Sequence, residues 1–110
     1  MNSFISLDEF KKAVIQIGTV ESAEPVPETD KLLRLEVNFG EGGTKQILSG
    51  IAEHVEPAAL IGRQFPFITN LEPRVIRGLV SNGMLLAVGE GDAFALLSPT
   101  TPVSPGSKIR

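Results

Sequence analysis

Glycine and proline interrupt this chain at short intervals, so the apolar runs between them are short. The 110 residues contain 11 glycines and 8 prolines. The cleanest run is LLRLEVNFG, in which Leu33, Leu35, Val37 and Phe39 share one face and polar side chains share the other. Strict alternation is typical of a strand with one buried face, and short strands separated by turn residues indicate a barrel or sandwich. The pattern predicts one small all-β domain over residues 1–110.

The order of the predicted strands narrows the fold further. A long strand at 13–26 has a phase slip at Gly18, which indicates a bulge or a sharp bend. The remaining elements are two strands joined by a glycine-rich loop at 40–43, a short helix at 55–63, and strands at 64–73 and 84–88. A bent strand, a hairpin, a short helix between strands 3 and 4, and a fifth strand are the parts of an OB-fold, a five-stranded Greek-key barrel.

Prolines and glycines also predict details of these elements. Pro57 is expected near the first position of the short helix, with Gly62 as its stop. Because Pro66 has no N–H to donate, the strand at 64–73 is expected to be bulged or to lie at a sheet edge. The segment at 72–83, EPRVIRGLVSNG, is expected to be a polar connection that carries arginines.

Two further segments lie outside the predicted barrel. Ser6 and Glu9 fit a capping box, which predicts a short N-terminal helix at 7–12 with Leu7 and Phe10 facing inward. A C-terminal extension follows the fifth strand and contains further apolar residues. These two segments either plug the ends of the barrel or form an interface between subunits.

The composition offers little for catalysis or for metal binding. The chain has no cysteine, and His54 is its only histidine, so thiolate sites and two-histidine metal sites are excluded. Phosphate loops and serine elbows are also missing from the sequence. We therefore expect a protein that is not an enzyme and that has no cofactor. No signal peptide or apolar run of roughly 20 residues is present, which predicts a cytoplasmic protein without membrane contact.

Charge and aromatic content limit how this chain could bind a nucleic acid. The net charge is −3, but the chain from Lys31 onward has eight Lys and Arg residues and only seven Asp and Glu residues. There is no Trp or Tyr, and four of the six Phe residues fall at core positions. Many OB-folds hold single strands by stacking bases on aromatic rings. Without those rings, phosphate contacts and shape would have to carry any RNA binding.

Four segments together resemble the tRNA-binding domain family. They are ETDKLLRLEVNFG, QILSGIAEHVEPAALIGR, TNLEPRVIRGLVSNGMLLA and LLSPTTPVSPGSKI, and they stand in the family's order from about Ile5 to Ile109. This family includes the C-terminal domain of many bacterial methionyl-tRNA synthetases and stand-alone dimeric tRNA-binding proteins. At 110 residues, the chain is similar to the stand-alone form.

The resemblance implies an OB-fold that binds folded tRNA by shape, as a homodimer, without reading sequence. It also implies contact positions, each of which has an ordinary structural alternative such as a turn, a core position or a solvated charge. These positions are Lys31, Ser49, Asn70, Arg74, Arg77, Ser81 and Met84. The chain departs from the family at 25–29, where PVPET stands before the Asp-Lys-Leu motif, and it is poorer in lysine before the fifth strand. Weaker and more salt-sensitive tRNA binding is therefore expected.

Two other functions remain open from the sequence. The related CsaA proteins share the fold and the dimer, and they resemble peptide-binding or chaperone modules. They lack the Asp-Lys-Leu and Ser-x-Gly-Met motifs that are present here. The third alternative is a domain that docks an aminoacyl-tRNA synthetase in trans. The expected partners are thus tRNA, a second copy of the chain and, in the third case, a synthetase.

Overall fold

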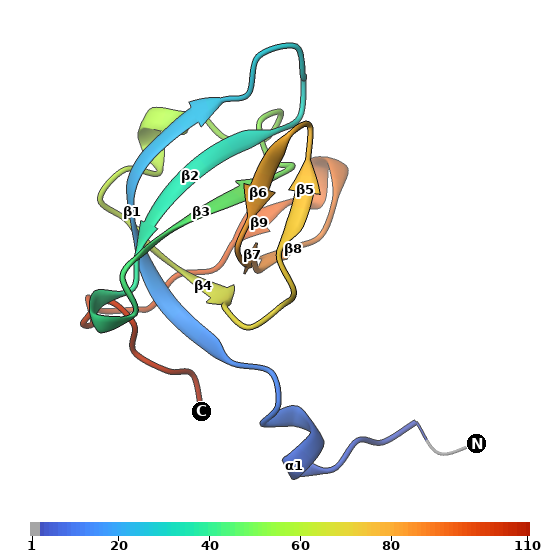
Figure 1. Cartoon of the computed structure of the whole chain (residues 1–110), viewed down its shortest axis with the longest axis vertical. Helices are drawn as coiled ribbons and strands as arrows, with labels where there is room; N and C mark the ends of the chain where they lie inside the picture. The colour runs from blue at the N-terminus through green and yellow to red at the C-terminus, as the bar shows by residue number, and fades with distance from the viewer. Residues whose placement is uncertain (1–2) are drawn as a thin grey trace.

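The centre of the molecule is a five-stranded antiparallel sheet that curls into a nearly closed barrel (Figure 1). The computed structural model describes residues 3–110. The strand order is β3-β2-β1-β4-β7. These strands are β1 (Ile15–Pro25), β2 (Leu33–Asn38), β3 (Thr44–Ser49), β4 (Gln64–Ile68) and β7 (Met84–Leu85). The predicted all-β, OB-like barrel is confirmed.

The long strand β1 serves both halves of the barrel. Its first part, from Ile15 to Thr19, pairs with β4, and its second part pairs with β2. At Gly18 an added Cβ would lie 2.4 Å from Val37 Cγ1, so glycine allows β2 to approach closely at the bend. The predicted irregularity exists, but the register shift lies between Val20 and Ser22.

The alternation on β2 places its apolar residues in the core, as predicted. Leu33, Leu35, Val37 and Phe39 are all buried. The rings of Phe39 and Phe67 meet edge to face, with centroids 5.5 Å apart. Each fully buried apolar side chain contributes roughly 1.5–3 kcal/mol to stability. This cluster therefore fixes the barrel on which the surface loops are mounted.

The predicted edge position of β4 is wrong, because β4 pairs with β1 on one side and with β7 on the other. Pro66 lies opposite Ile17, whose backbone groups bond instead to Gly106 and Ser107 in the C-terminal segment. On the other side, the Pro66 carbonyl accepts the Leu86 N–H at 3.0 Å, just beyond the end of β7. The missing N–H of proline is thus tolerated inside the sheet because the ladder with β7 ends there.

The segment at 72–83 is a β-hairpin, not the plain connection that was predicted. Strand β5 (Arg74–Ile76) pairs with β6 (Leu79–Ser81). The two residues between them, Arg77 and Gly78, have φ values of 53° and 80°. Positive φ at both turn positions defines a type I′ turn, which matches the twist of a two-residue hairpin. The hairpin therefore presents Arg77 at its tip.

The barrel closes through contacts between β3 and the end of β6. The Asn82 N–H donates to the Gln46 carbonyl at 2.9 Å. The Leu48 N–H donates to the Ser81 hydroxyl at 3.0 Å. The strands β3 and β7 are the two edges of the sheet and are not paired with each other in a ladder, so these bonds close the gap between them.

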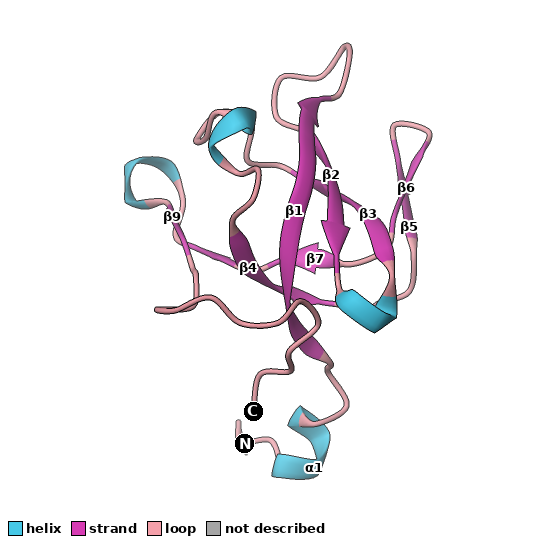
Figure 2. Cartoon of the chain, turned by 90° about the vertical axis from the view of Figure 1, so that its left-hand side faces the viewer, coloured by secondary structure: helices cyan, strands magenta, loops and turns pink. Residues whose placement is uncertain are grey.

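The predicted N-terminal helix is present, but its orientation differs from the prediction. Helix α1 (Leu7–Phe10) begins with the predicted capping box, in which Ser6 and Glu9 exchange two hydrogen bonds of 3.0 Å. Leu7 is 65% exposed and Phe10 is 43% exposed, so the prediction that these side chains face inward, toward the core of their own chain, is wrong. The helix lies on an arm that extends away from the barrel (Figures 1 and 2), where the barrel cannot cover its apolar face.

Short elements complete the chain. They are η1 (Gly40–Gly42), η2 (Pro57–Ala59), η3 (Gly91–Ala93), β8 (Ala87–Val88) and β9 (Ala95–Leu96). The predicted helix between strands 3 and 4 is the single turn η2, with Pro57 as its first residue. The predicted fifth strand at 84–88 is divided into β7 and β8, and β8 pairs with β9. No helix within residues 3–110 is long and apolar enough to cross a membrane.

The C-terminal extension divides its apolar residues between the core and the surface. Phe94 and Leu96 pack against the core cluster, as expected for a segment that covers the barrel. Leu97, Val103 and Ile109 are exposed. The end of the chain runs along the start of β1, where the Ile109 N–H donates to the Ile15 carbonyl at 2.9 Å.

Candidate nucleic-acid interface

The loop between β1 and β2 and the tip of the β5–β6 hairpin lie at the same end of the barrel, the upper end in Figures 1 and 2. A cavity of about 300 Å³ separates them, and its lining residues come from both elements. The lining consists of Glu24, Pro25, Val26, Pro27, Arg34 and Leu79. In an OB-fold, the strand 1–2 loop and the strand 4–5 connection flank the surface that binds oligonucleotides. The same two connections flank this cavity.

Lys31 lies on the β1–β2 loop and is exposed. The loop has internal support, because the Val26 N–H donates to the Leu32 carbonyl at 3.1 Å. The Lys31 carbonyl accepts the Ala52 N–H at 2.9 Å, which anchors the backbone while the side chain remains in solvent. Glu28 and Asp30 are exposed on the same loop, so negative charges lie close to the positive charge of Lys31.

Arg74 and Arg77 both lie on the hairpin and are exposed. Within residues 3–110, neither guanidinium has a carboxylate within 4 Å. Arg77 is held at the turn by a backbone conformation that few non-glycine residues adopt. Arg74 lies at the other end of the hairpin, opposite Ser81. Arg77 therefore belongs to the same end of the barrel as Lys31, and Arg74 lies nearer the base.

Ser49 and Met84 are half-buried residues of the barrel strands. Ser49 pairs with Leu33, two residues beyond Lys31, and so lies at the same end as the loop. Met84 pairs with Ile68 at the end of β4. Contact of either residue with RNA stays a prediction.

Ser81 is buried, with 1% of its surface exposed. Its hydroxyl accepts from the Leu48 N–H and donates to the Gly83 carbonyl at 3.1 Å. Both capacities are thus used inside the barrel. The geometry gives Ser81 a structural role, and its predicted RNA contact finds no support in this arrangement.

Asn70 lies at the opposite end of the barrel from Arg77. Its side-chain oxygen accepts the Val14 N–H at 2.8 Å, and its side-chain nitrogen donates to the Lys12 carbonyl at 2.6 Å. The amide thus ties the segment after α1 to the end of β4. Of the seven predicted positions, the structure brings Lys31, Ser49 and Arg77 to one end and separates Asn70 from them.

Sequence reasoning did not identify Arg34, Glu24 and Leu79 as candidates. Arg34 and Glu24 are cross-strand neighbours and form an ion pair. Both side chains are partly exposed and line the cavity with Leu79. The only sequence signal was the outward phase of Arg34 in the alternating strand. The partner strand and the hairpin that complete the cavity depend on tertiary structure.

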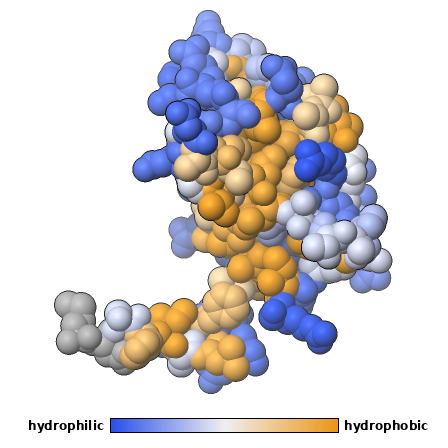
Figure 3. All heavy atoms as spheres, turned by 180° about the vertical axis from the view of Figure 1, so that it is seen from behind, coloured by the Kyte–Doolittle hydropathy of each residue, from blue (hydrophilic) through white to orange (hydrophobic). Residues whose placement is uncertain are grey.

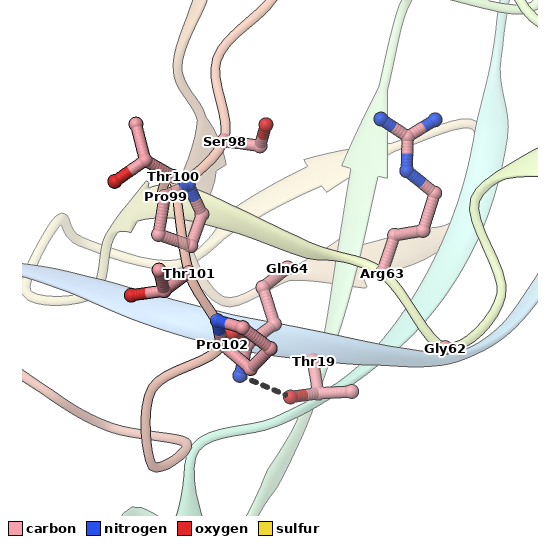
Figure 4. Close-up of a pocket in the computed structure, with 9 residues that line it drawn as sticks. All are labelled: Thr19, Gly62, Arg63, Gln64, Ser98, Pro99, Thr100, Thr101 and Pro102. Carbon is pink, nitrogen blue, oxygen red and sulfur yellow. Dashed lines mark hydrogen bonds between the residues drawn. The ribbon is translucent and has the colours of Figure 1, made fainter.

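A second cavity, of about 330 Å³, lies between the start of β4 and the C-terminal segment (Figure 4). Its wall includes Arg63 and three hydroxyl residues of the C-terminal segment, Ser98, Thr100 and Thr101. Gln64 donates to Thr19 Oγ1 at 3.1 Å and to the Val103 carbonyl at 2.6 Å. The bond to Val103 fastens the C-terminal segment to the barrel, and both bonds engage the Gln64 side-chain amide in the wall of the cavity.

An apolar band runs over the face opposite to that seen in Figure 1 and continues onto the N-terminal arm (Figure 3). On the arm, Phe4 is 87% exposed and Ile5 is 65% exposed. Monomeric proteins rarely expose large contiguous apolar surfaces, so such a band is typical of an interface.

In residues 3–110, no three His, Asp or Glu side chains gather as metal ligands would.

The sequence matches the model of the family described as "Putative tRNA binding domain" over residues 15–108. The chain is 49% identical over 106 residues to a methionine–tRNA ligase of Methanoregula boonei, covering 96% of this chain and 16% of that enzyme. It is 42% identical over 107 residues to the methionine–tRNA ligase of a Helicobacter pylori strain, covering 97% of this chain and 16% of that enzyme. The chain thus spans about a sixth of the length of these relatives.

Solved structures give the same relationship. The MetRS-related protein from Pyrococcus horikoshii superimposes with a TM-score of 0.92 at 33% identity, covering 99% of this chain and 100% of that one. The chaperone CsaA from Bacillus anthracis superimposes with a TM-score of 0.88, also at 33% identity, covering 98% and 100%. The family match over most of the chain confirms the resemblance that the sequence motifs indicated. The protein is a member of the tRNA-binding domain family.

Proposed function

We propose that this protein binds folded tRNA without catalysing a reaction, and that it does so in the cytoplasm as a homodimer. The observation that supports this most directly is the placement of Lys31 and Arg77. Two exposed cations, Lys31 and Arg77, lie on two connections at one end of the barrel, and residues next to these connections line a cavity. Arg offers a planar fork and Lys a point charge, and both suit phosphate.

The charges predict modest, salt-sensitive affinity and recognition by shape. Glu28 and Asp30 lie near Lys31, and Glu24 lies in the cavity. Their repulsion opposes the approach of the RNA backbone, so only a backbone that reaches both cations at once is held well. A folded RNA with a fixed spacing of phosphates meets that requirement better than a flexible strand.

The N-terminal arm supports the homodimer. Phe4, Ile5, Leu7 and Phe10 are exposed on the arm, and the apolar band of Figure 3 includes the surface next to it. In a two-fold dimer, the same surfaces of both subunits meet, so each arm can cover the band of the other copy. Two barrels would then offer their cationic ends to one RNA.

A gel shift with folded tRNA and an unstructured RNA of equal length tests recognition, and light scattering of the free protein tests the dimer. The proposal expects tighter binding of folded tRNA and a mass of twice the chain. Equal affinity for the two RNAs would contradict shape recognition. A monomer at high protein concentration would contradict the dimer.

Peptide binding is the second candidate, because the CsaA structure superimposes on this chain at the same 33% identity as the MetRS-related protein. The exposed apolar band could hold an apolar peptide. Fluorescence anisotropy with labelled apolar peptides distinguishes the two functions. Micromolar peptide binding together with no tRNA shift would favour this candidate, and the reverse result would favour tRNA.

A further inference from the structure

We propose that the cavity between the β1–β2 loop and the β5–β6 hairpin holds one unpaired RNA base, and that it prefers a base with an exocyclic amino group. This inference rests on the proposed tRNA binding and adds what is recognised beside the phosphates. It concerns the cavity lined by Glu24, Pro25, Val26, Pro27, Arg34 and Leu79. This surface is called the base slot below.

The size and walls of the base slot fit a single flat ring. Its volume of about 300 Å³ is at the lower limit of ligand pockets. Two proline rings, Pro25 and Pro27, and the Leu79 side chain from the hairpin give it apolar surfaces. Because the chain has no Trp or Tyr, the slot would hold a base between aliphatic and proline surfaces where other OB-folds use aromatic rings.

The ion pair in the wall of the slot supplies the polar recognition. Arg34 and Glu24 have 39% and 52% of their side chains exposed, so their polar atoms remain accessible. Bases stack on planar guanidinium groups, and a carboxylate accepts the amino N–H of a base. Adenine, cytosine and guanine carry such an amino group. Uracil has no amino group, and its one ring N–H lies between two carbonyl oxygens, which the Glu24 carboxylate would repel.

The surrounding cations place the base relative to the RNA backbone. Lys31 follows the loop residues that line the slot, and Arg77 lies two residues before Leu79. A nucleotide with its base in the slot would direct its flanking phosphates toward these two side chains. Base pairing would block entry, because a paired base has its amino group engaged and its faces stacked. The target is therefore an unpaired nucleotide in a loop or at an end of the RNA.

Chemical probing of tRNA in the complex tests the base slot. Dimethyl sulfate methylates unpaired adenine and cytosine, and kethoxal modifies unpaired guanine, so a base in the slot should become protected from its reagent when wild-type protein is added. Leu79→Trp fills the slot and should remove the protection at that base. Val88→Trp adds the same ring at exposed β8, outside the slot lining, and should keep the protection.

Arg34→Lys serves as a second variant, because it keeps the charge and removes the guanidinium plane. It should reduce the protection even if Leu79→Trp does not fold, and a melting curve shows whether each variant is folded. Replacing the protected base by uracil should weaken binding by roughly tenfold, since one bidentate or amino contact contributes about 1–3 kcal/mol of discrimination.

Two negative outcomes are distinguishable. If tRNA binds wild type but no base is protected, and Leu79→Trp and Arg34→Lys bind with unchanged affinity, the base slot is wrong while tRNA binding stands. If wild-type protein does not shift tRNA at all, the proposed function itself fails.

Discussion

The Ser81 hydroxyl accepts a hydrogen bond from the Leu48 backbone N–H at 3.0 Å, and this contact fastens the β5–β6 hairpin to β3. Ser81 belongs to the Ser-x-Gly-Met motif, whose resemblance to the family predicted a contact with tRNA, yet the Ser81 side chain is buried in the barrel. The same motif thus closes the sheet and holds in place the hairpin that carries Arg77. Its contribution to binding would be indirect, through the position of the hairpin.

Ser81→Ala should destabilise the protein by about 1–3 kcal/mol, because the buried Leu48 N–H would lose its acceptor. Urea unfolding measures this loss. Ser22→Ala is the matched control, since Ser22 is exposed on β1, and such surface changes are usually within about 0.5 kcal/mol. Equal stability of the two variants would contradict the closing role of Ser81.

Gly18→Ala should destabilise the barrel by about 1–3 kcal/mol, because its methyl group would meet Val37 Cγ1 at 2.4 Å and Phe39 Cε1 at 2.7 Å. Gly50→Ala is the control, since an added Cβ there has no atom within 4 Å. The difference between the two melting curves is the measurement. A Gly18→Ala protein as stable as Gly50→Ala would mean that β2 does not approach β1 this closely.

Asn70→Ala should loosen the segment that joins α1 to the barrel, because the bonds to the Val14 N–H and the Lys12 carbonyl are lost. Hydrogen exchange of the Val14 amide should become roughly fivefold faster, as expected for a loss of about 1 kcal/mol. The control variant Asn38→Ala loses a different hydrogen bond, the one from the Gly40 N–H to the Asn38 side chain at the turn after β2. That control should leave the Val14 amide unchanged, and an equal effect of both variants would argue against the Asn70 anchor.

The double variant Glu28→Gln/Asp30→Asn should bind tRNA roughly two- to fivefold more tightly, because it removes exposed negative charge beside Lys31. The gain should shrink as salt screens the charges. Glu90→Gln/Asp92→Asn changes the net charge equally at the connection between β8 and β9 and is the control. If both double variants gain the same affinity, net charge alone would explain the effect.

Much of the fold was readable from local pattern. The alternation of Leu33, Leu35, Val37 and Phe39 identified β2 and its buried face, and the capping box identified the start of α1. Both signals act over a few residues, where sequence spacing alone fixes geometry. The hairpin was missed because its turn is Arg77-Gly78, without the Asn-Gly or Asp-Gly pair that usually marks a type I′ turn.

The candidate site was only partly predictable, for a different reason. Lys31 and Arg77 were identified through family motifs, but the roles of Ser81 and Asn70 depend on partners 33 and 56 residues away in the chain. A polar side chain in a motif can satisfy its hydrogen bonds inside the protein or offer them to a ligand. Only the contacts in the folded chain distinguish these two uses.

Binding of tRNA by the double variant Lys31→Ala/Arg77→Ala tests the central claim most directly. The slope of log affinity against log salt should decrease in magnitude by roughly 1.4–1.8 relative to wild type, because two phosphate contacts are removed. The control, Lys108→Ala/Arg110→Ala, removes the same charge from the C-terminal segment and should keep the wild-type slope. Equal slopes for the two double variants would contradict binding at the Lys31 and Arg77 end of the barrel.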